Sequence, residues 1–244
     1  YSGGHMIGPL IGGYAIDFTG HAFAYLCFAL LSLLPVAILA WNRGIDIDAH
    51  APAGGQRSAL ALLKGRSLRR AIVTSGLVVT GWDLYAFFVP IYGHSIGLSA
   101  STIGIILGAF AVATFVVRMV LPIFTRRWGV EAVLAGSMFA GAAFFVPFPM
   151  IEYVPVLLAL SFGIGLALGS GQPLTLNLCY NRSPPGRSGE VTGLRLTINN
   201  ITHIGVPLAA GAAGSVLGVA PVFWANAAIL ATSGWLSRAL RHTP

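Results

Sequence analysis

Charged residues are scarce in this chain. Of its 244 residues, 14 are Lys or Arg and 7 are Asp or Glu, together 9%, against about 25% in soluble domains. A soluble fold of this length needs a charged, hydrated surface, which so few ionised side chains cannot provide. Hydrophobic residues make up 56% of the chain. The composition excludes intrinsic disorder, a nucleic-acid-binding module and an ordinary cytosolic enzyme, and it indicates an integral membrane protein.

Residues suited to catalysis or metal binding are also sparse. The two cysteines, Cys27 and Cys179, lie in or beside apolar runs without metal-ligand spacing, so we expect them to serve packing. The GxGxxxG pattern at residues 163–169 sits inside an apolar run and is no phosphate loop. No nucleophile, base and acid occur in an arrangement typical of an enzyme. We therefore expect neither catalysis nor a metal or other cofactor.

Long apolar runs dominate the sequence instead. Residues 18–42 and 196–237 contain no Asp, Glu, Lys or Arg, and residues 71–117 contain one, Asp83. Each run exceeds the ~20 apolar residues that span a bilayer. Divided at Gly, Pro and charged residues, the chain predicts eight transmembrane helices at residues 1–18, 22–41, 71–93, 100–122, 131–148, 153–177, 190–214 and 219–238. The predicted fold class is an all-α integral membrane bundle.

The basic residues predict the orientation of these helices. They gather in alternate links and at the C-terminus: Arg43, Arg57, Lys64, Arg66, Arg69, Arg70, Arg126, Arg127, Arg182, Arg187, Arg238 and Arg241. The other four links contain none, so the 42–70 link and the C-terminus should face the cytoplasm. Residues 57–70 mix leucines with five basic residues. This segment suits either a short helix on the anionic leaflet or a solvated loop.

An internal repeat relates the two ends of the chain at an offset of 198 residues. The pattern His-x3-Pro-Leu-x2-Gly occurs at residues 5–13 and again at residues 203–211. Two parallel repeats of six helices are typical of one transporter architecture. We therefore predict that 1–41 is the end of an N-terminal six-helix half, 42–70 a central linker and 71–244 a complete C-terminal half. About four helices should precede Tyr1 in a longer parent protein.

Several motifs in this framework resemble the major facilitator superfamily (MFS) of secondary transporters. Residues 4–13, Gly-His-Met-Ile-Gly-Pro-Leu-Ile-Gly-Gly, are similar to the antiporter motif of the family's fifth helix. The glycines and proline at its core would bend that helix and let it pack closely: Gly8, Pro9, Gly12 and Gly13. The 42–70 segment resembles the family's central cytoplasmic loop, and 97–104 and 193–200 resemble the openings of its eighth and eleventh helices.

A further match is the segment Arg118-x3-Pro122-x4-Arg127-Trp-Gly129. It resembles the second-half copy of the family's G-x3-D-R-x-G loop, with Pro122 in place of the first Gly and Arg126 in place of Asp. The resemblance implies twelve helices in the intact protein, alternating access around a central cavity, and a cytoplasmic gating role for Arg118, Arg127 and Gly129.

Asp83 is the first candidate for a transport residue. It lies 13 residues after Arg70, or about 20 Å along a helix, which is near the middle of a bilayer. A charge at that depth costs at least ~2.5–3.5 kcal/mol, so such residues face a cavity or a partner. Asp83 is either a site for a proton or a substrate cation, or an anchor to a neighbouring helix.

A polar stripe on the 190–214 helix supplies the other candidates. Thr192, Arg195, Asn199, Thr202 and His203 fall within about 100° of arc, so they should face a wet cavity or another helix. Arg195 would attract an anionic group of the substrate or pair with Glu190. His203 would relay protons, because imidazole titrates near physiological pH, or would serve packing. Gln172, next to the helix-breaking Pro173, would line the cavity.

These observations favour a proton-coupled secondary transporter that exports small organic solutes, with export resting on the motif at residues 4–13. The alternatives are a proton symporter for uptake of a sugar or organic acid and, from another class, a non-transporting scaffold or receptor. Buried Asp83 and the polar stripe favour a transport pathway. The expected partners are a small-molecule solute, protons and the lipid bilayer, with no nucleic acid. We expect a monomeric multi-pass protein of a bacterial plasma membrane.

Overall fold

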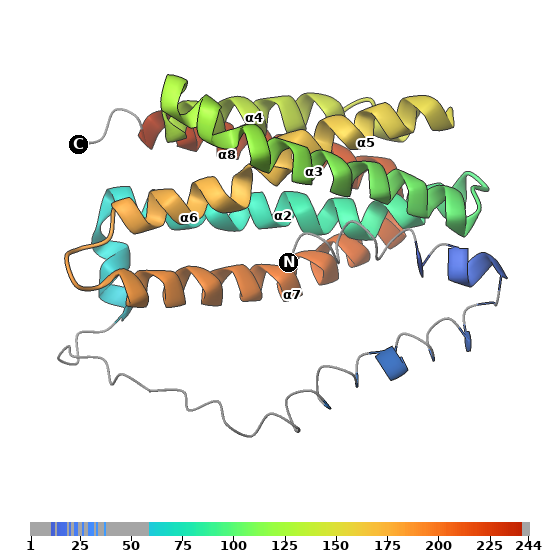
Figure 1. Ribbon diagram of the computed structural model, residues 1–244, viewed down its shortest axis with the longest axis horizontal. Helices are drawn as coiled ribbons and strands as arrows, with labels where there is room; N and C mark the ends of the chain where they lie inside the picture. The colour runs from blue at the N-terminus through green and yellow to red at the C-terminus, as the bar shows by residue number, and fades with distance from the viewer. Residues whose placement is uncertain are drawn as a thin grey trace.

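The computed structural model describes residues 59–240 without a gap and, before them, residues 11–12, 14–18, 20, 22–23, 26, 29–31, 33 and 37. All regular structure in residues 59–240 is helical: η1 (Ala59–Lys64), α2 (Arg66–Ser95), α3 (Ala100–Trp128), α4 (Val130–Phe145), η2 (Phe148–Met150), α5 (Val154–Gly169), α6 (Gly171–Asn181), α7 (Ser188–Leu217) and α8 (Val219–Leu240). Figure 1 shows a bundle of roughly aligned helices, with α7 at one edge, α2 and α6 beside it, and α3, α4 and α5 farther away.

The described helices are long and apolar enough to cross a membrane. Five segments meet both conditions: Arg66–Ser95, Ala100–Trp128, Val130–Met150, Val154–Asn181 and Val219–Ala239. The sixth long helix, α7, has 30 residues, and its polar stripe makes it less apolar than these five. The all-α membrane bundle predicted from the sequence is confirmed. The first two predicted spans, 1–18 and 22–41, lie mostly outside the described residues.

Several helix ends differ from the sequence predictions. α2 begins five residues before the predicted 71–93 span, and α3 continues six residues past the end of the predicted 100–122 span. The α2 extension is mostly basic, and the α3 extension follows Pro122 and contains Arg126 and Arg127, yet the backbone remains helical through both. The predicted 153–177 helix is interrupted at Ser170, where α5 gives way to α6.

Polar and apolar side chains are distributed on α7 in the opposite sense to a soluble protein. Arg195 and Asn199 are buried, whereas Ile201, Ile204 and Leu208 are exposed. Hydrocarbon solvates apolar side chains and leaves polar groups without partners, so a membrane helix turns its polar face towards other helices. The sequence-predicted stripe therefore faces the bundle, as expected for a membrane protein.

Glycines let α3 and α5 approach each other closely. A Cβ atom on Gly165 would lie 2.3 Å from the carbonyl oxygen of Phe110, and one on Gly169 would lie 2.8 Å from the Cα of Thr114. Both distances are shorter than any stable van der Waals contact. The glycines of this segment thus serve helix packing.

The link between α7 and α8 is a single residue. α7 ends at Leu217 and α8 begins at Val219, so Gly218 makes the whole turn. Its φ of 86° lies in the left-handed region, which glycine adopts without the steric cost that a Cβ would add.

Candidate functional site

An acid–imidazole pair joins α2 to α7. The Nδ1 atom of His203 lies 2.8 Å from Oδ1 and 2.7 Å from Oδ2 of Asp83. The side chain of Asp83 is 9% exposed and that of His203 is 44% exposed. The two residues that the sequence singled out separately are therefore direct partners, with the carboxylate buried and the imidazole reaching the surface of the described bundle.

A second polar contact joins the same two helices. Ser75 Oγ donates to Asn199 Oδ1 at 3.2 Å, and both residues are buried. Ser75 precedes Asp83 by eight residues and Asn199 precedes His203 by four, so the two contacts lie on one face of each helix. α2 and α7 therefore run in the same direction (Figure 1), and these two contacts form a polar seam between them.

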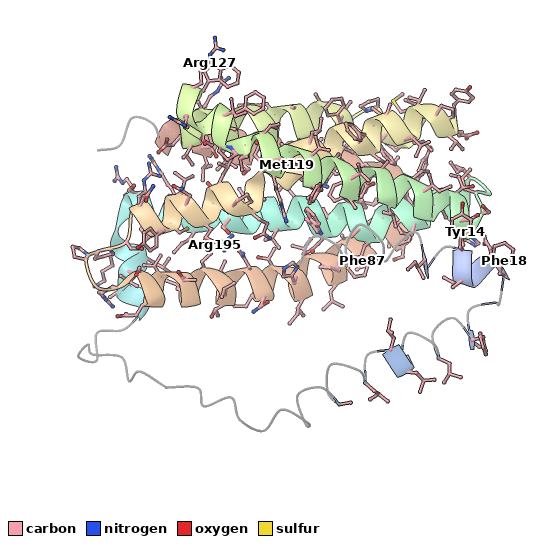
Figure 2. The ribbon with its side chains drawn as sticks, in the orientation of Figure 1. Tyr14, Phe18, Phe87, Met119, Arg127 and Arg195 are labelled. Atoms are coloured by element: carbon pink, nitrogen blue, oxygen red, sulfur yellow. The ribbon has the colours of Figure 1, made fainter. Side chains whose placement is uncertain are left out.

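Arg195 occupies the next position along this seam, four residues before Asn199. Its Nη2 atom donates to the backbone oxygen of Gln172 at 3.4 Å, to Gln172 Oε1 at 3.1 Å and to Thr175 Oγ1 at 3.1 Å. Figure 2 shows Arg195 between α6 and α7. Of the two roles considered for Arg195, the pairing with Glu190 is not the one found, because that carboxylate accepts from Arg187 Nε at 3.0 Å. Arg187 and Glu190 are three residues apart, a spacing that brings side chains together on a helix.

The interruption between α5 and α6 brings a second arginine into contact with the helix backbone. Pro173 has no N–H, so the carbonyl of Gly169, four residues earlier, lacks its helical donor. Arg118 Nε of α3 lies 3.4 Å from that carbonyl oxygen and donates to it. Gln172, predicted to line the cavity, accepts from Arg195 through its Oε1 atom.

The predicted gating loop is a helix in the structure. Arg118 and Arg127 both belong to α3, which continues through Trp128, and only Gly129, with a φ of 82°, lies outside it. The correction has a physical cause, because Pro122 is tolerated inside a long membrane helix where it was taken to mark the helix end. The guanidinium of Arg127 lies over the ring of Trp128, 5.6 Å from its centroid, in the last turn of α3 (Figure 2).

The antiporter-like motif is described at one of its four core positions. Gly8, Pro9 and Gly13 lie outside the described residues, whereas Gly12 lines a cavity of about 660 Å³ with Pro90 and other residues of α2 and α3.

Three polar residues of the bundle interior were missed by the sequence reasoning. Ser75 and Thr175 are the partners of Asn199 and Arg195, and Asn226 of α8 donates from Nδ2 to the backbone oxygen of Gly81 at 3.3 Å. Helical spacing from Asp83 would have identified Ser75, and Asn226 is conspicuous as an amide within an apolar run. In the part of the chain that the structure describes, no group of three or more His, Cys, Asp or Glu residues could hold a metal ion.

Comparison with known proteins identifies the family of this chain. The model of the Major Facilitator Superfamily matches residues 1–204 and, in a second alignment, residues 71–244. The chain is also 22% identical, over 252 aligned positions, to the uncharacterized MFS-type transporter YuxJ of Bacillus subtilis (strain 168). That alignment covers 98% of this chain and 64% of the relative, so the chain spans less than two thirds of the relative's length. Because the family model matches most of its residues, the chain belongs to the Major Facilitator Superfamily, whose members are membrane transporters.

Proposed function

We propose that the intact protein is a proton-coupled secondary transporter that exports small organic solutes by alternating access. The observation that best supports this is the Asp83–His203 pair, with His203 Nδ1 within 2.8 Å of both carboxylate oxygens. A proton that binds Nε2 of the exposed imidazole converts the pair to imidazolium and carboxylate. The Nδ1 proton then moves to the buried carboxylate, which leaves both side chains neutral.

The electrostatics of the pair couple the proton to a conformational change. A buried carboxylate in a bilayer costs at least ~2.5–3.5 kcal/mol, and protonation removes that cost. A helix arrangement that buries Asp83 is therefore favoured when the pair carries the proton, and one that exposes it is favoured when the proton has left. This difference between two states is what a ligand needs in order to shift an equilibrium.

The division of the chain is part of the same proposal. We assign residues 1–41 to the end of an N-terminal half, 42–70 to a cytoplasmic linker and 71–244 to a C-terminal half of six helices. The double match of one family model to residues 71–204 supports two similar halves. A contact between the two halves supports this topology: Asp17 Oδ2 accepts from the backbone N–H of Ser101 at 2.8 Å. Both residues lie next to links without basic residues, which the charge pattern assigns to the side of the membrane opposite the cytoplasm.

A reconstituted system tests the proton site. Full-length protein is placed in proteoliposomes with an imposed pH gradient, and the fluxes of p-aminohippurate, glucose and ethidium are followed as anionic, neutral and cationic probes. We expect the gradient to drive at least one flux and Asp83→Asn to reduce it to the rate without a gradient. Glu152→Gln, which removes an exposed carboxylate between η2 and α5, should leave the flux unchanged. Coupled flux that persists in Asp83→Asn would contradict the assignment.

Protonation of Asp83 can also be measured without a transported solute. Infrared spectra recorded as the pH is lowered should show a carboxyl band that is lost in Asp83→Asn and retained in Glu152→Gln. His203→Gln should shift the pH at which the band appears, whereas His94→Gln, at the exposed end of α2, should not. The direction of the driven flux separates export from uptake.

A further inference from the structure

Arg195 is a buried charge without a carboxylate partner among the residues that the structure describes. It is 4% exposed, and its Nη2 donates only to neutral oxygens of α6. Its Nε is buried and has no hydrogen-bond partner. The ion-paired carboxylates of the described residues have other partners: Glu131 pairs with Arg182, Glu190 with Arg187 and Asp83 with His203.

This arrangement leaves the guanidinium charge uncompensated. A guanidinium stays protonated in proteins, so Arg195 cannot become neutral on burial as a lysine or histidine can. Removal of an ion from water costs several kcal/mol unless an opposite charge lies close by. Neutral oxygens accept hydrogen bonds but bring no such charge. The site as built therefore favours an anion over a neutral or cationic group.

The geometry of the unpaired atom specifies the kind of anion. Arg binds carboxylates through two parallel N–H···O bonds, which makes the interaction directional as well as charged. The unpartnered Nε lies on the edge of the guanidinium that one carboxylate can engage together with a terminal nitrogen. The buried hydroxyl of Thr175 accepts from Nη2 at 3.1 Å and donates to the backbone oxygen of Gly171 at 2.8 Å, so it holds Nη2 in place while Nε stays open to a ligand.

Position along α7 connects this site with the acid–imidazole pair. Arg195, Asn199 and His203 follow one another at intervals of four residues, so they lie on one face, and about 12 Å separates the first from the last. The His203 end of this stripe is accessible and the Arg195 end is enclosed by α6. Pro173 removes one backbone hydrogen bond between α5 and α6, so a tilt of α6 away from Arg195 would bend the chain at this junction.

We propose that Arg195, with Gln172 and Thr175, is the subsite for a carboxylate group of the transported solute, an inference that rests on the proposed transport function. The solutes are then small organic acids rather than sugars or cations. In the enclosed arrangement Gln172 and Thr175 hold the guanidinium, and in the open arrangement the solute carboxylate takes their place.

Binding of matched ligands tests the subsite. Benzoate, benzamide and benzylamine share one shape and differ in charge, and their effect on the thermal unfolding of the full-length protein in detergent reports binding. We expect benzoate to raise the unfolding temperature and the other two to leave it unchanged. Arg195→Gln should weaken benzoate binding about 10- to 100-fold, as loss of a charge-assisted bidentate contact does. Arg187→Gln, which removes a partly exposed arginine just before α7, should bind benzoate like the wild type.

Further variants separate a binding role from a structural one. Arg195→Lys keeps the charge but loses the planar fork, so it should bind benzoate with intermediate affinity; it also serves if Arg195→Gln does not fold. If Arg195 only joins α6 to α7, both variants lower the unfolding temperature and leave the benzoate-induced rise intact. That result would overturn the proposal, as would equal effects of benzoate and benzamide or no effect of benzoate on the wild type.

Failure of the proposed subsite can be distinguished from failure of the proposed proton site. Asp83→Asn removes no part of the subsite, so it should retain benzoate binding while losing coupled flux. Benzoate binding that depends on Arg195, together with unchanged coupled flux in Asp83→Asn, would reject the proton site and keep the subsite. The converse pattern would reject the subsite alone.

Discussion

Replacement of Gly165 by alanine tests whether α3 and α5 depend on direct backbone contact. The added Cβ would lie 2.3 Å from the backbone oxygen of Phe110 and 2.8 Å from the Cβ of Ala113. Non-bonded carbon atoms settle about 3.5–4.0 Å apart. The backbone of α3 cannot rotate out of the way as a flexible side chain could, so the two helices must separate by about 1 Å.

The separation has a cost that can be worked out from the contacts. Overpacking of a closely packed interface costs about 1–3 kcal/mol. Two hydrogen bonds also cross this interface, from Thr114 Oγ1 to Gly165 O at 3.3 Å and from Arg118 Nε to Gly169 O at 3.4 Å. A further 1 Å would break both, at about 0.5–1.5 kcal/mol each. We expect Gly165→Ala to lower the free energy of unfolding by about 2–6 kcal/mol.

Thermal and denaturant unfolding of the protein in detergent, followed by tryptophan fluorescence, measures this effect. Gly193→Ala is the matched control, because a Cβ there has no atom within 4 Å and alanine favours a helix by about 0.5–1 kcal/mol. The two substitutions should change stability in opposite directions. Equal stability of Gly165→Ala and the wild type would refute the packing argument.

Two further tests address the helix interruption and the polar seam. Pro173→Ala supplies the N–H that the carbonyl of Gly169 lacks, so the free energy of unfolding should rise by up to about 3 kcal/mol, and the unfolding temperature should rise with it. An unchanged unfolding temperature would show that the proline does not cause the interruption. Ser75→Ala and Asn199→Ala should show a coupling of about 0.5–1.5 kcal/mol in a double-mutant cycle. The hydroxyl of Thr232 donates within α8, so Thr232→Ala should show no coupling to Asn199→Ala.

Hydropathy predicted the helices of residues 71–240 well but misjudged their ends. The apolar runs mark the part of each helix that hydrocarbon surrounds, and helices continue beyond it wherever backbone hydrogen bonding does. The Arg66–Arg70 turn of α2 and the Arg126–Trp128 turn of α3 are such continuations. Composition carries no information on this, because arginine is an acceptable helix residue as well as a loop residue.

The candidate residues were predictable one by one, and their partnerships were not. Asp83 was conspicuous as a carboxylate within an apolar run and His203 as part of a stripe, but 120 residues separate them. Their contact depends on how α2 and α7 are rotated and aligned, which no local pattern determines. The sequence left open whether Arg195 pairs with Glu190 or attracts an anionic group, and in the structure Glu190 pairs with Arg187, three residues before it.

The interruption at Ser170 falls within a helix predicted as continuous over 153–177, although its cause, Pro173, was recognised. Pro173 predicted a broken hydrogen bond, and the break appears at the carbonyl four residues before it, as helix geometry requires. The role of Arg118 at that carbonyl was not predictable, because it depends on the close approach of α3 that Gly165 and Gly169 permit.

The one-residue turn at Gly218 fixes the C-terminal end of α7, so α7 can rotate about that end. A single residue spans at most ~3.6 Å, so α7 cannot slide past α8 and can only swing about their junction. Arg195 is 23 residues from Gly218 and His203 is 15, which is about 34 Å and 22 Å along the helix. A swing of about 10° would move Arg195 by roughly 6 Å and His203 by roughly 4 Å. If the helix bends at Pro207 instead, the arms are about 18 Å and 6 Å, and the ratio grows. Either way, a small displacement at the acid–imidazole pair becomes a larger one at the buried arginine.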